Sequence, residues 1–98
     1  MVKPLDDAEV LNVIQNAPGF KDRVITSRDI RDSMAKRNFD MTDVINVLSK
    51  ASRVKPAWNT KTGEWNYDVF GKDLDGNDLT IRILPIDDST GIILVTGF

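Results

Sequence analysis

The sequence of 98 residues contains no cysteine and no histidine. The absence of cysteine excludes disulfide bridges, and the absence of cysteine and histidine together excludes a structural zinc site. The absence of histidine also removes the commonest general acid or base, so any catalysis must use Lys, Arg, Tyr, Asp or Glu. No phosphate-binding glycine loop, nucleophile elbow or metal-ligand cluster occurs. We therefore expect neither a metal nor a cofactor.

Long apolar runs are absent as well. No stretch approaches the ~18 residues of a membrane span, and residues 1–7 are acidic and lack the apolar segment of a signal peptide. We expect a cytoplasmic protein without a membrane partner, folded as a single domain over residues 1–98. The net charge of −2 argues against nonspecific binding to nucleic acid, but it leaves room for a local basic patch.

The second half of the chain has the pattern of strands separated by turns. Four runs are rich in apolar, β-branched and aromatic residues: Val54–Trp58, Trp65–Phe70, Leu79–Leu84 and Ile92–Thr96. The clusters between them, Asp75-Gly76 most clearly, favour reversals and are too short for parallel crossovers. The pattern predicts a four-strand antiparallel meander. Pro56 makes the first strand an edge strand or an irregular segment, and the continuous apolar character of the last strand favours a position that is central or packed under a helix.

Alternation within the strands separates two faces of this sheet. In the third strand Thr80 and Arg82 lie opposite the apolar set Leu79, Ile81 and Ile83. In the second strand Asn66, Asp68 and Phe70 lie opposite Trp65, Tyr67 and Val69. The apolar face needs a cover, which the first half of the chain must supply.

Three helices are predicted in that first half, over residues 6–16, 27–37 and 40–51. Thr26 or Ser27 caps the second helix, Asn38 ends it, and Asp40 opens the third. The third helix has an apolar stripe, formed by Met41, Val44, Ile45 and Leu48. The segment Val24–Thr26 is too short to predict as a strand. We therefore predict an α+β fold in which the N-terminal helices pack on the sheet, the third through Val44, Ile45 and Leu48.

Cations and aromatic residues follow one another where the third predicted helix leads into the sheet. They are Arg53, Lys55, Lys61, Trp65, Tyr67 and Arg82. If the strands are neighbours, these side chains could converge on one patch suited to phosphate contact and base stacking. The alternative is that the charged side chains of the strands are solvated and the aromatic residues belong to the core. The interspersed acidic residues Glu64 and Asp68 favour this alternative.

The order of several short motifs resembles the MqsR branch of the RelE-like toxins over nearly the whole chain. The similar segments are Ile25–Ile30, Phe39–Ile45, Val47–Ser49, Lys55, Trp65, Asp68-Val69 and the closing apolar strands. The chain is also similar to a broader set of uncharacterised small bacterial domains with a Trp/Tyr-rich strand and an Asp-Gly turn. This resemblance implies a RelE-like fold.

In toxin members the resemblance further implies metal-independent cleavage of messenger RNA and an antitoxin protein as partner. The 2′-hydroxyl attacks the adjacent phosphodiester, so the site must move protons and stabilise negative charge. By this resemblance Lys55, Tyr67 and Arg82 are the catalytic candidates. The candidates for holding RNA are Arg53, Lys61, Trp65 and Asn66. The family's third-strand tyrosine falls near Thr80 of this sequence. The alternative expectation is therefore a relative that keeps the fold but has lost the cleavage chemistry.

Two further functions are compatible with the sequence. One is a non-catalytic protein-interaction module with the same fold. The other is a winged-helix DNA-binding protein, with residues 27–37 and 40–51 as the helix-turn-helix and 53–70 as the wing. Against the winged helix, Asp40 and Asp43 lie at the end of the recognition helix that would meet phosphate.

Overall fold

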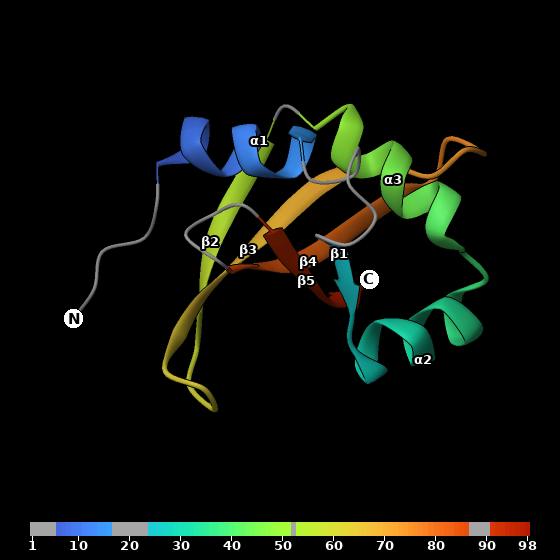
Figure 1. Cartoon of the computed structure of the whole chain (residues 1–98). Coiled ribbons are helices and arrows are strands. Elements are labelled where there is room, and N and C mark those ends of the chain that lie inside the picture. Colours follow the sequence, from blue (N-terminus) through green and yellow to red (C-terminus); the bar gives the residue numbers. More distant parts are fainter. Residues whose placement is uncertain (1–5, 17–23, 52, 87–90) are drawn as a thin grey trace.

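A computed structural model describes residues 6–16, 24–51, 53–86 and 91–98, in which three helices pack on a five-stranded sheet (Figure 1). The elements are α1 (Asp7–Asn16), β1 (Val24–Thr26), α2 (Arg28–Arg37), α3 (Met41–Ser49), β2 (Arg53–Asn59), β3 (Glu64–Lys72), β4 (Asp78–Ile86) and β5 (Gly91–Gly97). The α+β class and the N-terminal position of the helices are confirmed. The predicted number of four strands is wrong, because β1 is a fifth.

The sheet is mixed, with the strand order β1-β5-β4-β3-β2. Strands β2 to β5 form the predicted antiparallel meander, and β2, which contains Pro56, lies at its edge. The short β1 pairs in parallel with β5, Val24 opposite Ile92 and Thr26 opposite Leu94. A parallel pair needs a long connection, and here the intervening helices and strands supply it. β5 is therefore an internal strand, as its apolar run indicated.

The helix ends agree closely with the predicted signals. The Ser27 hydroxyl accepts a hydrogen bond from the Ile30 amide, and Asn38 ends α2 in the left-handed conformation at φ 57°. Asp40 and Asp43 form a reciprocal capping box at the start of α3, which ends at Ser49, two residues before the expected end. None of the described helices is both long and apolar enough to cross a membrane.

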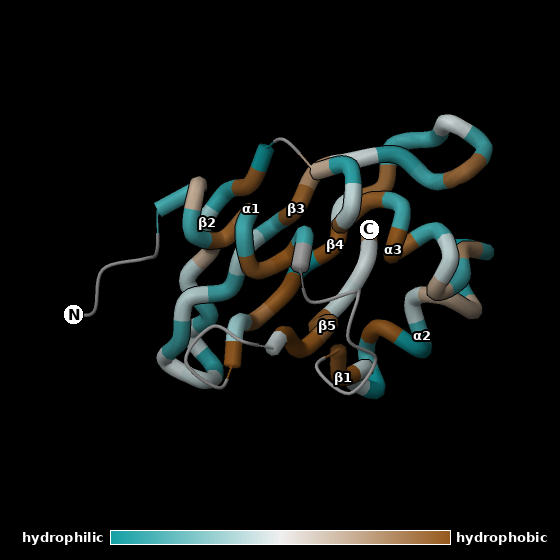
Figure 2. Tube along the Cα trace, turned by 45° about the horizontal axis from the view of Figure 1, so that its top comes forward, coloured by the Kyte–Doolittle hydropathy of each residue, from teal (hydrophilic) through white to brown (hydrophobic). Residues whose placement is uncertain are grey.

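The core lies between the sheet and a layer formed by α1 and α3, and Ile30 of α2 also belongs to it. Figure 2 shows the apolar stretches along the helices and the strands. Val44 and Leu48 of α3 are buried as predicted, but Ile45 is 41% exposed. Val47 takes the expected place of Ile45. A Cβ on Gly71 of β3 would lie 3.0 Å from Val47 Cγ1, so the bare backbone of Gly71 lets this side of α3 approach the sheet.

Asp43 also ties α3 to the turn between β3 and β4. Its Oδ1 accepts a hydrogen bond of 2.9 Å from the Leu74 amide, and its Oδ2 accepts one of 3.0 Å from the Asp40 amide. These hydrogen bonds, the one from Leu74 first, hold the pKa of the Asp43 carboxyl below its ordinary value of 3.8. The charged carboxylate is thus the form that the fold favours.

Asp43→Asn is expected to lower the free energy of unfolding in a pH-dependent way. Because the folded-state pKa lies below the unfolded value, the charged carboxylate stabilises the fold above about pH 4 and loses this effect as the pH falls through the lowered pKa. Urea unfolding of wild type and variant from pH 7 down to pH 2 measures the difference, which should shrink in acid. A difference that stays constant over this range would contradict the role of the charge. Asp75→Asn, in the turn between β3 and β4 that Asp43 contacts, is the control.

Candidate functional site

The sheet face turned away from α1 and α3, here called the outer face, carries polar and aromatic side chains. Residues directly opposite one another on neighbouring strands share a face, so the register defines rows across the sheet. The first row is Arg53, Phe70, Thr80 and Phe98. The second row is Lys55, Asp68, Arg82 and Thr96. Phe98 belongs to the first row because it exchanges two backbone hydrogen bonds of 2.8 Å with Thr80.

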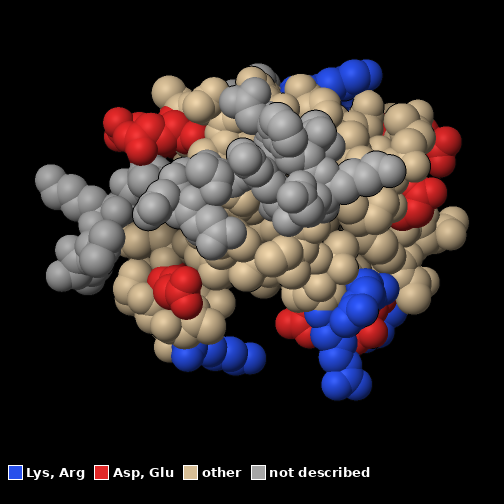
Figure 3. Space-filling view, viewed as in Figure 1, with Lys and Arg blue, Asp and Glu red and all other residues tan. Residues whose placement is uncertain are grey.

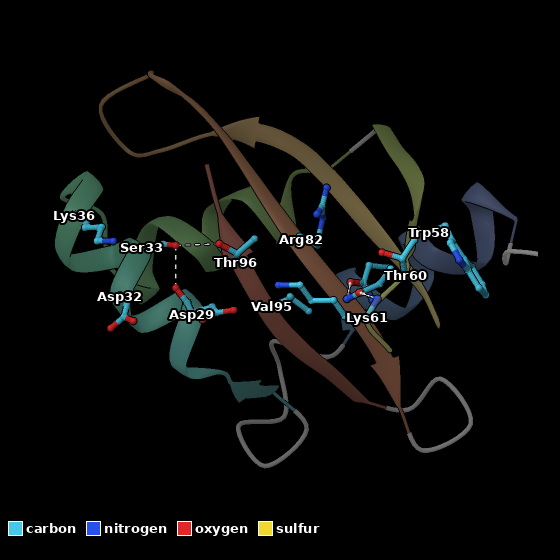
Figure 4. A pocket seen from close by; sticks show the side chains of 12 residues that line it. Asp29, Asp32, Ser33, Lys36, Trp58, Thr60, Lys61, Arg82, Val95 and Thr96 are labelled. Atoms are coloured by element: carbon cyan, nitrogen blue, oxygen red, sulfur yellow. Dashed lines mark hydrogen bonds between the residues drawn. The ribbon is translucent and has the colours of Figure 1, made fainter. Parts of the chain in front are cut away.

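A pocket of about 520 Å³ opens at one end of the outer face, between α2 and the β2–β3 hairpin (Figure 4). Its lining includes Asp29, Asp32 and Lys36 on α2, Lys61 on the hairpin, and Asn66, Arg82 and Thr96 on the strands. The hydroxyls of Ser33 and Thr96 lie 3.0 Å apart and join α2 to β5. In Figure 4 the Lys61 side chain extends from the hairpin over the sheet. The pocket is therefore a polar groove with cations on both walls.

Arg82 is held in a fixed position at the middle of the outer face. Its Nε donates to Asp68 Oδ1 at 2.7 Å and its Nη2 donates to Asp68 Oδ2 at 3.1 Å. The hydrogen bond to Asp68 raises the pKa of the guanidinium, against the opposing effect of burial. Its Cζ also lies 5.5 Å from the centre of the Phe98 ring. The positive charge of Arg82 is thus largely balanced within the protein.

The other cations of the outer face differ in whether a carboxylate pairs with them. Lys72 forms an ion pair of 2.7 Å with Asp78, but no described carboxylate lies within ion-pairing distance of Arg53, Lys55 or Lys61. Over α2, by contrast, positive and negative side chains are mixed, as Figure 3 shows. Cations that no described carboxylate pairs with therefore follow one another along β2 and its hairpin.

Asn66 and Asn59 fix the hairpin that carries Lys61. The buried Asn66 accepts a hydrogen bond of 3.1 Å on its Oδ1 from Asn59 Nδ2. Asn59 Oδ1 in turn accepts one of 3.0 Å from the Lys61 amide. Asn66, predicted to hold RNA, therefore lines the pocket and also positions the neighbouring lysine.

The structure brings only part of the predicted site together. Arg53, Lys55, Asn66 and Arg82 lie on the outer face, and Lys61 reaches it from the hairpin. Tyr67 lies on the core face opposite Ile83 and is 3% exposed. Of the two arrangements considered, the single patch of cations with Trp65 and Tyr67 is wrong, and the alternative of charged strand residues beside core aromatic residues holds for these two, because the strand register puts Tyr67 and Arg82 on opposite faces.

Trp65 also belongs to the core face. It is half-buried, packs against the core, and meets Trp58 edge-to-face with ring centres 5.2 Å apart. The aromatic residues that do share the outer face with the cations are Phe70 and Phe98, which the predicted site did not include. The alternation of β3 carried the signal for Phe70, since it grouped this residue with Asn66 and Asp68.

The winged-helix alternative does not fit the sheet. β4 and β5, which have no place in a winged helix, form the middle of this sheet. α3, the would-be recognition helix, buries Val44, Val47 and Leu48 in the core. Within the described ranges no group of three or more carboxylates is arranged to hold a metal ion.

Comparison with known proteins gave no match at three levels. No protein-family model, no curated protein and no solved structure is significantly similar to the chain. The similarity to RelE-like toxins remains a prediction from the residues quoted above.

Proposed function

We propose that the protein binds single-stranded RNA on the outer face, as a relative of the RelE-like, MqsR-type toxins that lacks an assembled cleavage site. The observation that carries this proposal is that Arg53 and Lys55 on the outer face of β2, and Lys61 on the hairpin wall of the polar groove, have no described carboxylate within ion-pairing distance, in a chain whose net charge is −2. Such a local excess of unpaired cations favours a phosphate backbone.

Binding without turnover is the form of this function that the geometry favours. Cleavage by the 2′-hydroxyl needs groups that take up a proton, stabilise the phosphorane and protonate the leaving oxygen. Lys55 and Arg82 share the outer face, but Tyr67 is buried on the other side of the sheet. Arg82 is already engaged by both oxygens of Asp68.

The RNA backbone should follow β2 and the hairpin rather than α2. Asp29 and Asp32 on the α2 wall repel phosphate. Lys36 is the one cation among the described α2 residues that line the pocket. Lys55 and Lys61, on the opposite side, attract it. The groove can thus hold the bases over the strands while the phosphates lie along the hairpin side.

The double variant Lys55→Ala with Lys61→Ala is expected to bind RNA about tenfold more weakly at moderate salt. The loss of two phosphate contacts should also reduce the slope of log K against log salt concentration by about 1.4, since each contact to a single strand contributes about 0.7. Fluorescence anisotropy with a labelled single strand of about ten nucleotides measures both quantities. Lys50→Ala, at the C-terminal cap of α3, is the control on the helix side.

Two results would contradict this proposal. One is the absence of RNA binding by the wild type, and the other is an equal effect of Lys50→Ala and the double variant. Incubation of the RNA with and without EDTA tests turnover at the same time, and intact RNA is expected. Growth arrest and transcript cleavage on induced expression, both lost in Lys55→Ala, would instead establish the endoribonuclease.

A protein partner, such as an antitoxin, is the second candidate. Trp58 on the edge strand β2 is 42% exposed and contacts Trp65, and aromatic residues of this kind are enriched in protein interfaces. This candidate makes a different prediction. Wild type would not bind RNA, and Trp58→Ala would weaken the complex with the protein partner while Lys55→Ala would not.

A further inference from the structure

We infer that two arginine–phenylalanine stacks on the outer face, Arg53 with Phe70 and Arg82 with Phe98, are base-stacking sites for the RNA. This inference deepens the proposed function and rests on it. It assigns the aromatic part of the interface to residues outside the predicted site, since Trp65 and Tyr67 lie on the core face.

The two stacks have the same construction. Arg53 Cζ lies 5.1 Å from the centre of the Phe70 ring, and Arg82 Cζ lies 5.5 Å from the centre of the Phe98 ring. Phe98 is 44% exposed. Asp68 holds the Arg82 guanidinium at two points, which fixes its plane before any ligand binds. Bases stack on aromatic rings and on arginine planes alike, so each pair offers a stacking surface, and that of Arg82 and Phe98 is preformed.

The spacing of the stacks favours an unpaired strand. Phe70 and Phe98 lie on either side of Thr80 in the same row, which separates them by two strand spacings, about 10 Å. Consecutive stacked bases in a duplex are about 3.4 Å apart. A nucleic acid that occupies both sites must therefore have splayed, unstacked bases, as single-stranded RNA does when proteins read it.

The neighbouring charges are placed for the backbone of such a strand. Lys55 lies two residues from Arg53 on the same face of β2 and is the β2 member of the second row. A strand whose bases reach Phe70 and Phe98 can therefore place phosphates near Lys55 and continue toward Lys61. The combination of aromatic rings, arginine planes and unpaired lysines on one open sheet face matches the chemistry of single-stranded nucleic acid.

The test compares wild type with the double variant Phe70→Leu and Phe98→Leu, which keeps apolar bulk but removes both rings. The probes are a labelled RNA of about ten nucleotides and an abasic ribose-phosphate chain of the same length. The double variant is expected to bind the RNA about tenfold or more weakly, with an unchanged salt slope, because stacking and not phosphate contact is lost. Its affinity for the abasic chain should equal that of wild type. Ile45→Ala, a comparably exposed apolar position on α3, is the control.

The outcomes separate the two proposals. If the wild type binds RNA and the double variant binds it equally well, the stacking sites are wrong and the proposed function stands. If the wild type binds no RNA, both are overturned. Should the double variant fail to fold, Arg53→Lys serves in its place, since it keeps the charge and removes the guanidinium plane. A loss of affinity for RNA but not for the abasic chain supports the inference, and an unchanged affinity for RNA overturns it.

Discussion

Leu48→Ala is expected to lower the free energy of unfolding by about 2–5 kcal/mol, enough to move the thermal midpoint by about 8 °C or more on the usual scale of about 4–8 °C per kcal/mol. Leu48 is completely buried in the core beneath α3. Its truncation removes apolar contacts and leaves a cavity that the packed strands cannot fill. Urea unfolding followed by circular dichroism gives the loss directly.

The matched control for this change is Ile45→Ala on the same helix. Ile45 is half-exposed, so its truncation should cost only a few tenths of a kcal/mol. Helix propensity differs between Leu and Ile by only a few tenths of a kcal/mol, so the larger part of the difference between the two losses measures burial. Equal losses at the two positions would contradict the orientation of α3 on the sheet.

Arg82→Ala is expected to destabilise the fold by about 2–3 kcal/mol. The change leaves the Asp68 carboxylate, whose side chain is only 13% exposed, without its two strong hydrogen bonds. Because the Arg82 side chain is 35% exposed, the expected loss of stability is smaller than for a fully buried ion pair. Thermal unfolding of the variant at neutral pH measures the effect.

Replacing both partners tests the cause of that loss. Asp68→Leu with Arg82→Leu removes both charges together, so this double variant should be more stable than Arg82→Ala alone. A double variant that is at least as unstable would show that the cost lies elsewhere, for example in packing on Phe98. In either case Lys55→Ala, which removes an exposed side chain, is the cleaner substitution for tests of RNA binding and cleavage.

Local signals in the sequence predicted most of the fold. Ser27, Asn38 and Asp40 set the ends of α2 and α3, because caps depend on neighbouring residues only. The order of the meander followed from short connections between its strands. β1 could not be predicted in this way, since a three-residue strand is defined only by its parallel partner β5, nearly seventy residues further along the chain.

The candidate site was predicted only in part, for two physical reasons. Alternation sorted the residues within each strand, but only the register of β3 with β4 shows that Tyr67 and Arg82 lie on opposite faces, so the succession of cations and aromatic residues along the chain suggested one patch. The pairing of Thr80 with Phe98, which places the second ring on the outer face, depends on the register of β4 and β5. The bidentate contact between Arg82 and Asp68 likewise needed the alignment of β3 with β4.

The most direct test of RNA binding on the outer face is an NMR titration of the isotope-labelled protein with a short single-stranded RNA. The side-chain amide of Asn66 and the Nε–H of Arg82 report on the outer face. The side-chain amide of Gln15, which donates to the Ala51 carbonyl oxygen, reports on the helix side. Saturable shifts of the Asn66 and Arg82 signals with an unmoved Gln15 signal are the predicted result. Shifts confined to Gln15 and its surroundings, or no shifts at all, would contradict it.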